Sequence, residues 1–425
     1  MASLVYQIFV DSFGGGLDGV AARLDHLAAL GADAVWLTPI FRAPSNHKYD
    51  ASSLDEVDEQ LGGDAAFDRL AAAARARGVA LYLDGVFNHV GEQHPWTRER
   101  REFFRGSPWR GFASLPELDL ANAELREILF GANGVVERWT RRGASGWRLD
   151  CANDLGREVC ALIGAAARRA GARGGVIGEV MAWPAGFHGA LDGVMNYWLR
   201  SAALELASGR GRAQNIQAAL DRLAAELDPA TLARSWSVVS SHDTPRLSSA
   251  LDGEPAARQA LALAFAYPGV PLLYYGEEIG MTGGADPANR APMIWDERLW
   301  DRARLDWIVR LSSLRRELPA LARGRYVSLA QPGLDVVAFA RVTDRPADTL
   351  LFVANATRAP LDAKIFLPLD GLFDALPLVD RLAPDAARAH VAAGTLALSL
   401  PAHGVALYQP ADDHPSGYRF FKGAV

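Results

Sequence analysis

Four short segments of this chain place acidic, basic or imidazole side chains at the end of an apolar run. They are Asp84-Gly85-Val86-Phe87-Asn88-His89, Gly146-Trp147-Arg148-Leu149-Asp150, Gly178-Glu179-Val180 and Ser241-His242-Asp243. Arg148 lies two residues before Asp150, a spacing that puts both side chains on one face of a strand. A guanidinium in that position holds the carboxylate in its ionised form. Taken alone, such a pair is more typical of a structural ion pair than of a catalytic site.

Several carboxylates on one rim would suit the cleavage of glycosidic bonds. In that reaction one protonated carboxyl group donates to the leaving oxygen, and an ionised carboxylate attacks the anomeric carbon. Arg148 supplies a cation for Asp150, whereas the segment of Glu179 has none, so Glu179 is the better candidate for the acid. A metal-dependent hydrolase that uses the histidines and aspartates as ligands is an alternative. It has little support, because the sequence contains no His-x-His or His-Glu-x-x-His spacing.

The elements that must position these groups alternate between apolar strands and amphipathic helices. Strands are predicted over 5–10, 34–38, 80–86, 146–150, 175–180, 191–197, 236–240 and 270–275. Helices are predicted over 19–30, 67–77, 125–142, 155–170, 199–227, 258–267 and 299–314. Eight such units predict an α/β protein with a (β/α)8 TIM barrel. Because the active groups of these barrels lie at the C-terminal ends of the strands, the four segments should meet on one rim.

The domain organisation follows from the same pattern. Residues 1–323 are predicted to form the catalytic barrel, with a short inserted lobe after the third strand at about 89–123, where periodicity is lost. Trp96, Trp109 and Phe112 could be platforms on which sugars stack, but packing within that lobe is favoured. Strand-like runs at 336–341, 349–355, 396–400 and 405–409 predict a C-terminal antiparallel β-sandwich domain over 324–412. The tail, 413–425, has no interpretable pattern.

Composition excludes several classes of partner. The net charge of −6 argues against nucleic acid or an anionic membrane as a partner. Because no targeting segment or long apolar run is evident, we expect a cytoplasmic protein. Two cysteines, Cys151 and Cys160, are too few for a disulfide framework, and both are predicted to be reduced core residues.

A glycine pattern near the start of the chain fits the dinucleotide-binding fingerprint. Gly14, Gly16 and Gly19 have the required spacing between a predicted strand and a predicted helix. The next predicted strand, however, runs into Thr38-Pro39-Ile40 and supplies no acidic residue for a ribose. Nucleotide binding is therefore not expected.

Together, the four segments resemble the motifs of the α-amylase family of retaining glycoside hydrolases. They occur in the order of the family's motifs, each at the end of a predicted strand, and the resemblance extends over nearly the whole chain. Finer segments resemble the neopullulanase, cyclomaltodextrinase and maltogenic amylase group. They include Tyr6-Gln7-Ile8-Phe9, Met195-Asn196-Tyr197 and Tyr274-Tyr275-Gly276-Glu277-Glu278-Ile279-Gly280-Met281.

The resemblance implies a role for each matched residue. Asp150 would be the nucleophile, Glu179 the general acid/base, and Asp243 the carboxylate that stabilises the transition state. The other matched residues would bind the sugar or orient the carboxylates. They are Tyr49, which would stack on the sugar, His89 and His242, which would hydrogen-bond it, Arg148, which would orient Asp150, and Asp84.

The resemblance also implies an activity. We expect hydrolysis of α-1,4-glucosidic bonds in maltooligosaccharides, cyclomaltodextrins, pullulan or starch through a covalent glycosyl-enzyme. The alternative is a transglycosylase, or a trehalose synthase-type isomerase that acts on maltose. No cofactor is expected to be required. Related enzymes often bind calcium, and Asn88 is the candidate ligand, although the chain has no dense Asp/Asn loop.

Three departures from the group concern binding rather than chemistry. The chain begins at the first barrel strand, whereas the group carries an N-terminal β domain that helps to form its dimer. We therefore expect a monomer or a weak homo-oligomer. Met181 stands where the group has tryptophan two residues after the acid, and Leu115-Pro116-Glu117-Leu118-Asp119 replaces a Met-Pro-Lys-Leu-Asn segment.

Overall fold

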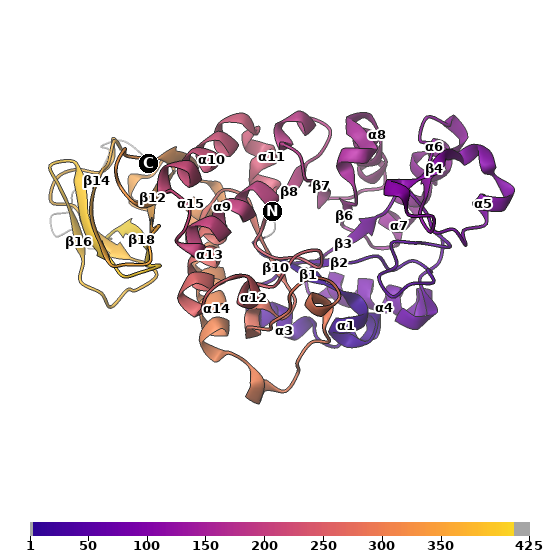
Figure 1. The fold of residues 1–425 in the computed structure, drawn as a ribbon, viewed down its shortest axis with the longest axis horizontal. Coiled ribbons are helices and arrows are strands. Elements are labelled where there is room, and N and C mark those ends of the chain that lie inside the picture. Colours follow the sequence, from indigo (N-terminus) through magenta and orange to yellow (C-terminus); the bar gives the residue numbers. More distant parts are fainter. Residues whose placement is uncertain (1–2, 412–425) are drawn as a thin grey trace.

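The protein consists of a closed parallel barrel, a small insert and a C-terminal antiparallel sheet (Figure 1). This computed structural model describes residues 3–411, so the tail predicted over 413–425 lies outside the described residues. In Figure 1 the C-terminal sheet and the insert lie at opposite sides of the barrel. The predicted fold class is confirmed.

Eight parallel strands form the barrel, and the first pairs with the last. They are β1 (Val5–Ile8), β2 (Ala34–Leu37), β3 (Ala80–Gly85), β6 (Gly146–Leu149), β7 (Gly175–Val180), β8 (Gly193–Asn196), β9 (Trp236–Val238) and β10 (Val270–Tyr274). Because these strands are buried on both faces, most of their residues are apolar, which made them recognisable in the sequence.

The helices between the strands cover the outside of the barrel. The α-helices within residues 3–411 are α1 (Val10–Gly14), α2 (Leu17–Ala21), α3 (Leu24–Leu30), α4 (Gly63–Ala76), α5 (Trp96–Glu99), α6 (Ala123–Phe130), α7 (Val135–Arg142), α8 (Ala152–Arg169), α9 (Tyr197–Ser208), α10 (Ala213–Glu226), α11 (Pro229–Arg234), α12 (Leu247–Ala250), α13 (Glu254–Ala266), α14 (Arg302–Glu317) and α15 (Pro319–Arg323). Short 3-10 turns are η1 (Glu59–Leu61), η2 (Arg101–Phe103), η3 (Trp109–Gly111), η4 (Pro184–Phe187), η5 (Glu277–Ile279), η6 (Ala288–Arg290), η7 (Glu297–Leu299) and η8 (Pro346–Asp348). None of these helices is long and apolar enough to cross a membrane.

Three helices predicted as continuous are broken. The segment 199–227 divides into α9 and α10 at Gly209, whose φ of 59° caps α9 in the left-handed region. The segment 125–142 divides into α6 and α7 around Gly131 and Gly134. The segment 19–30 divides into α2 and α3. The apolar spacing continues across this break, so the sequence did not reveal it.

The glycines of the apparent dinucleotide fingerprint pack against each other. A Cβ added to Gly19 would lie 2.0 Å from the carbonyl oxygen of Gly14, so the backbones of α1 and α2 approach too closely for any side chain. Close packing of the backbone therefore accounts for the presence of glycine at both positions.

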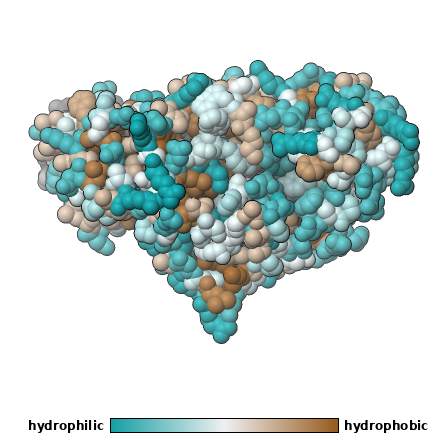
Figure 2. Space-filling view, viewed as in Figure 1, coloured by the Kyte–Doolittle hydropathy of each residue, from teal (hydrophilic) through white to brown (hydrophobic). Residues whose placement is uncertain are grey.

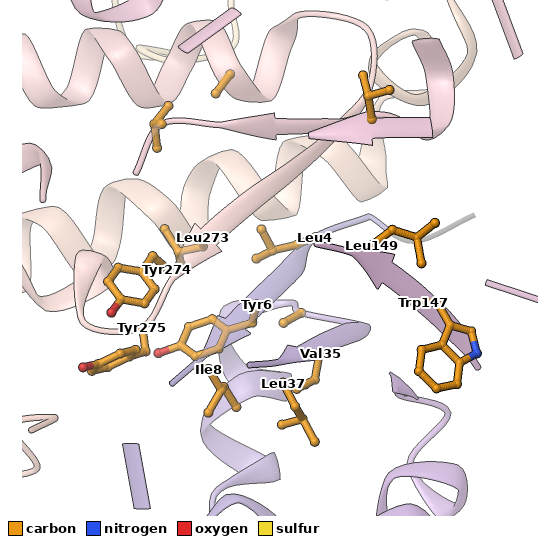
Figure 3. Packing of buried hydrophobic residues seen from close by; sticks show 14 of the residues in the cluster. Leu4, Tyr6, Ile8, Val35, Leu37, Trp147, Leu149, Leu273, Tyr274 and Tyr275 are labelled. Atoms are coloured by element: carbon orange, nitrogen blue, oxygen red, sulfur yellow. The ribbon is translucent and has the colours of Figure 1, made fainter. Parts of the chain in front are cut away.

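Strand side chains alternate between two apolar clusters. Tyr6, Ile8, Val35 and Leu37 face outward and pack beneath the helices (Figure 3). The intervening residues, Trp36 among them, fill the barrel interior together with side chains of β3, β9 and β10. The barrel interior is thus a packed core.

The insert and the C-terminal sheet complete the molecule. Within the insert, β4 (Phe104–Pro108) pairs antiparallel with β5 (Pro116–Leu118). The C-terminal sheet contains β11 (Arg325–Ser328), β12 (Val336–Val342), β13 (Leu350–Asn355), β14 (Leu361–Phe366), β15 (Pro377–Asp380), β16 (Ala389–Ala392), β17 (Thr395–Leu400) and β18 (Val405–Pro410). It curls around a core of its own. The sequence analysis found four of these strands and missed β11, β14, β15 and β16, which are short or only half-buried.

Most of the surface in the view of Figure 2 is hydrophilic, but hydrophobic residues gather on the projection at the bottom. That projection is the segment 282–301 between β10 and α14 (Figure 1), which carries the exposed side chains of Ile294 and Leu299.

Candidate active site

The C-terminal ends of β3, β6, β7 and β9 bring the predicted site residues together. A cavity of about 660 Å³ at this end of the barrel is lined by five of them. The five are Tyr49, His89, Asp150, Glu179 and Asp243. The other three are buried next to these: Asp84, Arg148 and His242. Parallel strands in register explain the convergence, since Arg148 of β6 lies directly beside Asp84 of β3.

Arg148 is the centre of the charged cluster. Its Nη1 donates to Oδ1 of Asp84 and to Oδ1 of Asp150, both at 2.8 Å. Its Nη2 lies 3.0 Å from Oε2 of Glu179, in an ion-pair contact that lacks hydrogen-bond geometry. The guanidinium is fully buried and lies 5.0 Å from the ring centroid of Trp36. One cation thus serves three carboxyl groups.

Burial and mutual repulsion set the protonation of the carboxyl groups. Burial, with a further contribution from Asp150 and Asp243, raises the pKa of Glu179 to about 7 although Arg148 opposes the shift. Burial also raises the pKa of Asp243, and it raises that of Asp84 to about 7. Burial alone would lower the pKa of Arg148, but the Asp84 and Glu179 carboxylates outweigh it and hold that pKa well above its usual range. Glu179 can therefore carry a proton near neutral pH.

Tyr49 and His242 form a hydrogen-bonded pair beside the cluster. Their rings are parallel, with an interplanar angle of 2°. The Tyr49 hydroxyl lies 2.5 Å from Nε2 of His242 and donates to Oδ2 of Asp84 at 3.2 Å. Because the Gln7 amide donates to Nδ1 of His242 at 2.7 Å, the imidazole proton lies on Nε2. Burial, reinforced by Arg148, lowers the pKa of His242 well below its usual value, so this ring is a neutral hydrogen-bonding group.

One sequence prediction for a cysteine is wrong. Cys151 is half-buried and lines the cavity, whereas Cys160 is buried as expected. The reason lies in the backbone, which turns into the left-handed region at Cys151 (φ 49°) directly after β6. No pattern in the sequence signalled that turn.

Arg290 is a second cation that the sequence analysis did not select. Its Nη2 donates to Oδ1 of Asp243 at 3.3 Å, and its Nε donates to the carbonyl oxygen of His242 at 3.0 Å. It follows β10, 47 residues beyond Asp243 in the chain, so spacing alone could not connect the two. Only its position shortly after Asp286-Pro287, a segment of the family resemblance, could have drawn attention to it.

Aromatic residues of the insert form one wall of the cavity. Trp109 stacks on His89, with ring centroids 4.9 Å apart, and its Nε1 donates to Oδ2 of Asp154 at 3.0 Å. Phe112 also lines the cavity and is 57% exposed, so the expectation that it packs within the lobe is wrong. Met181, at 53% exposure, lines the same cavity.

Two places in the site concern a metal ion, namely Asn88 and a group of three potential ligands. Across residues 3–411, one group of three His, Cys, Asp or Glu ligands lies close together, and it consists of Asp150, Cys151 and Glu179. Asn88 is buried next to His89, and its Nδ2 lies 3.4 Å from Nδ1 of that ring. Calcium at Asn88 stays a prediction.

Comparisons with known proteins agree with this geometry. The family model described as "Alpha amylase, catalytic domain" matches residues 6–114 and 179–314. The segment with Arg148 and Asp150 lies between these two parts. Among solved structures, Ttha1563 from Thermus thermophilus superimposes with a TM-score of 0.83 at 31% identity, covering 96% of this chain and 99% of that one.

Two curated relatives are similar over most of this chain. Neopullulanase 2 of Thermoactinomyces vulgaris is 36% identical over 345 residues, which are 74% of this chain and 58% of the relative. The cyclomaltodextrinase of Geobacillus thermopakistaniensis (strain MAS1) is 31% identical over 93% of this chain and 70% of the relative. The chain thus spans between 58 and 70% of the length of these two proteins.

Proposed function

This chain belongs to the α-amylase family of glycoside hydrolases, which act on α-glucans, and from this membership we propose a more specific activity. The protein is a retaining hydrolase that cleaves α-1,4-glucosidic bonds in maltooligosaccharides, cyclomaltodextrins, pullulan or starch. The bond is broken in two displacements through a covalent glycosyl-enzyme. The names of the two curated relatives support cyclic dextrins and pullulan within this range.

The distance between two carboxyl groups carries the proposal. One oxygen of Asp150 and one oxygen of Glu179 lie within 4.8 Å of each other. Retaining glycosidases have carboxyl groups about 5–5.5 Å apart, whereas inverting enzymes need about 6.5–9.5 Å to admit a water molecule between substrate and base. The short distance supports direct attack by a carboxylate.

Each group has a state suited to its step. Glu179, with its raised pKa, donates its proton to the glycosidic oxygen as the bond to the anomeric carbon breaks. Asp150, paired with Arg148, forms the new bond to that carbon. In the second step a water molecule gives a proton back to Glu179 and attacks the same carbon, which releases Asp150. Asp243, beside Arg290, is placed to hydrogen-bond the sugar hydroxyls as positive charge develops.

Two substitutions test the assignment. Asp150→Asn should lower kcat/KM by at least about 10⁴-fold without unfolding the protein, because no other group can form the intermediate. Glu179→Gln should reduce cleavage of maltotriose strongly but spare the first step with activated aryl glycosides, which need little acid assistance. If the purified Asp150→Asn variant turned over at the normal rate, the nucleophile would be a different residue.

Product analysis tests the substrate range and the alternative activity. Maltotriose, γ-cyclodextrin and pullulan are incubated in parallel, and NMR detects the anomer released first. Retention supports the proposal, and inversion contradicts it. Incubation with maltose distinguishes hydrolysis from transfer, because trehalose or longer chains would show that a sugar hydroxyl replaces water in the second step.

A further inference from the structure

Cys151 contacts both carboxyl groups that carry the proposed reaction. Its backbone N–H donates to Oε2 of Glu179 at 3.0 Å, and its Sγ donates to Oδ2 of Asp150 at 3.0 Å. It also lines the cavity in which the substrate would bind. The two steps outlined above assign it no role.

An unusual backbone conformation produces both contacts. Cys151 has φ 49° and ψ 41°, in the left-handed region that residues with a side chain rarely adopt. It precedes the first residue of α8, and the turn lets one residue present its amide to one carboxyl group and its thiol to the other. Strained conformations that persist at a reaction centre are often functional, and here the contacts suggest what the function is.

The two oxygens of Asp150 have unequal partners. Oδ1 accepts a charge-assisted hydrogen bond from Arg148 at 2.8 Å, from a guanidinium that is fully buried. Oδ2 accepts its hydrogen bond from the thiol of Cys151, which is a weak donor. The guanidinium therefore stabilises charge on Oδ1, while Oδ2 is held in position with little loss of nucleophilicity.

The thiol remains a donor over the working pH range. Burial, and then the neighbouring carboxylate of Asp150, raise the pKa of Cys151 far above its usual value. A thiolate, which is the reactive form of cysteine, is therefore suppressed. Cys151 acts through its hydrogen bond and is not itself a nucleophile.

We propose that Cys151 is a positioning residue that selects Oδ2 of Asp150 as the attacking oxygen and aims it at the anomeric carbon. The inference rests on the proposed function, in which Asp150 is the nucleophile. As Oδ2 bonds to the anomeric carbon, the glycosidic C–O bond breaks and the Glu179 proton moves to the leaving oxygen. The S–H bond of Cys151 stays intact throughout, so no oxidant or reductant takes part.

Two substitutions at Cys151 distinguish the contribution of its thiol from that of its backbone amide. Cys151→Ala removes the thiol donor and keeps the amide contact to Glu179, whereas Cys151→Ser replaces the thiol with a hydroxyl donor. For Cys151→Ala we expect kcat/KM on an activated aryl glycoside to fall about threefold to tenfold, which corresponds to one lost hydrogen bond. KM should change by less than about twofold, because this hydrogen bond serves the reacting oxygen rather than the bound sugar.

The pH profile gives a measurement that a purely structural role would not affect. Loss of the donor should move the acid limb of the kcat/KM profile about 0.4–1 pH unit higher, since the ionised nucleophile loses a hydrogen bond. Cys151→Ser should restore the acid limb to its wild-type position. Cys160→Ala, on the same helix with its Sγ 3.8 Å from the carbonyl oxygen of Ala152, is the matched control and should leave the profile unchanged.

Three outcomes would overturn the inference. They are an unmoved acid limb in Cys151→Ala, a melting temperature that falls while the pH profile does not move, and failure of Cys151→Ser to restore the limb. Asp150→Asn is measured in parallel. If that variant is inactive and the acid limb of Cys151→Ala is unmoved, the inference about Cys151 fails and the proposed function stands. If Asp150→Asn is active, the proposed function itself fails.

Discussion

Two of the regions that contain buried arginines differ in the kind of partner that the guanidinium has. In the active site, Arg148 is surrounded by the carboxylates of Asp84, Asp150 and Glu179. Near the junction of the barrel helices and the C-terminal sheet, Arg315 of α14 and Arg341 of β12 are also buried, but within residues 3–411 they donate to backbone carbonyl groups. Arginine can satisfy either kind of acceptor because its donors form a rigid fork.

The junction arginines stabilise the ends of helices. Arg315 donates to the carbonyl oxygens of Phe265, Gly269 and Leu321, and Arg341 donates to those of Ala266 and Gly324. These carbonyls lie at or just beyond the C-terminal ends of α13 and α15, where helices leave acceptors without partners and carry partial negative charge.

The two regions shift arginine pKa values in opposite directions. The pKa of Arg148 is raised well above its usual range by carboxylates, although burial opposes the shift. Burial lowers the pKa of Arg315 to about 10, and burial together with Arg315 lowers that of Arg341 to about 9. Burial removes the water that stabilises a charged guanidinium group. Carbonyl dipoles compensate for that loss only in part, whereas carboxylates more than compensate for it. The three carboxyl partners of Arg148 therefore distinguish it from Arg315 and Arg341, whose partners are backbone dipoles.

The largest effect is expected from removing the active-site cation. Arg148→Met should lower kcat/KM by about 10³-fold or more, because Asp150 and Glu179 lose the cation that orients them and balances their charge. The free energy of unfolding, measured in urea at pH 6, should change less, since the carboxyl groups can take up protons. Arg148→Lys keeps the charge but not the fork, so it should recover only part of the activity. Activity within tenfold of wild type in Arg148→Met would remove the basis of the comparison.

The junction should show the reverse pattern. Arg315→Met should lower the free energy of unfolding by about 1–3 kcal/mol, because buried carbonyls lose their donors. The kcat/KM of the folded protein should stay within about twofold of wild type, since the cluster lies outside the active site. Arg316→Met, on the same helix but exposed, is the matched control and should change neither quantity. A large loss of activity in folded Arg315→Met would contradict a purely structural role.

Arg290 combines both kinds of partner and should therefore be intermediate. It donates to the Asp243 carboxylate and to the His242 carbonyl oxygen. Because the carboxylate contact is long, at 3.3 Å, we expect Arg290→Met to lower kcat/KM about tenfold to thirtyfold. Steady-state kinetics on maltotriose measure this change. A loss as large as that of Arg148→Met would show that the distinction by partner type is too simple.

Keeping Glu179 protonatable should lower the free energy of unfolding at neutral pH without involving any arginine. Its folded pKa of about 7 lies above the ordinary glutamate value of 4.5, so the folded state binds the extra proton between these two pH values. The contribution of Glu179 to stability is therefore present at low pH and declines as pH rises from 4.5 to 7. Glu179→Gln cannot ionise and escapes this loss, so it should gain up to about 3 kcal/mol on wild type between about pH 4.5 and pH 8. Urea denaturation at both pH values measures the gain, and equal differences at the two values would contradict the shift.

Several features of the fold were predictable because they depend on local pattern. The eight barrel strands are continuous apolar runs, and each carries its pattern in a few adjacent residues. The breaks near Gly131 and Gly209 were missed because apolar spacing continued past them. Strand β14 was missed because only every second residue of it is buried and the strand is short.

The residues of the candidate site also fall into a group that the sequence could reveal and a group that it could not. Asp84, Arg148, Glu179 and Asp243 could be selected because each follows or ends an apolar strand, and β-sheet register brings such positions together. Arg290 and Trp109 could not be selected on the same grounds, because they reach the cavity from long loops with no periodic constraint.

The amino-acid sequence alone was enough to predict the barrel, the carboxylates on its rim and the pairing of Arg148 with Asp150, because residues two apart on a strand share a face. The folded structure was needed to show that Arg148 also serves Asp84 and Glu179, and that Arg315 and Arg341 donate to backbone carbonyls. It was also needed to show that Cys151 turns towards both carboxyl groups of the proposed reaction. Protonation and the choice of hydrogen-bond donor depend on burial and on neighbours distant in sequence, and these become defined only when the chain is packed.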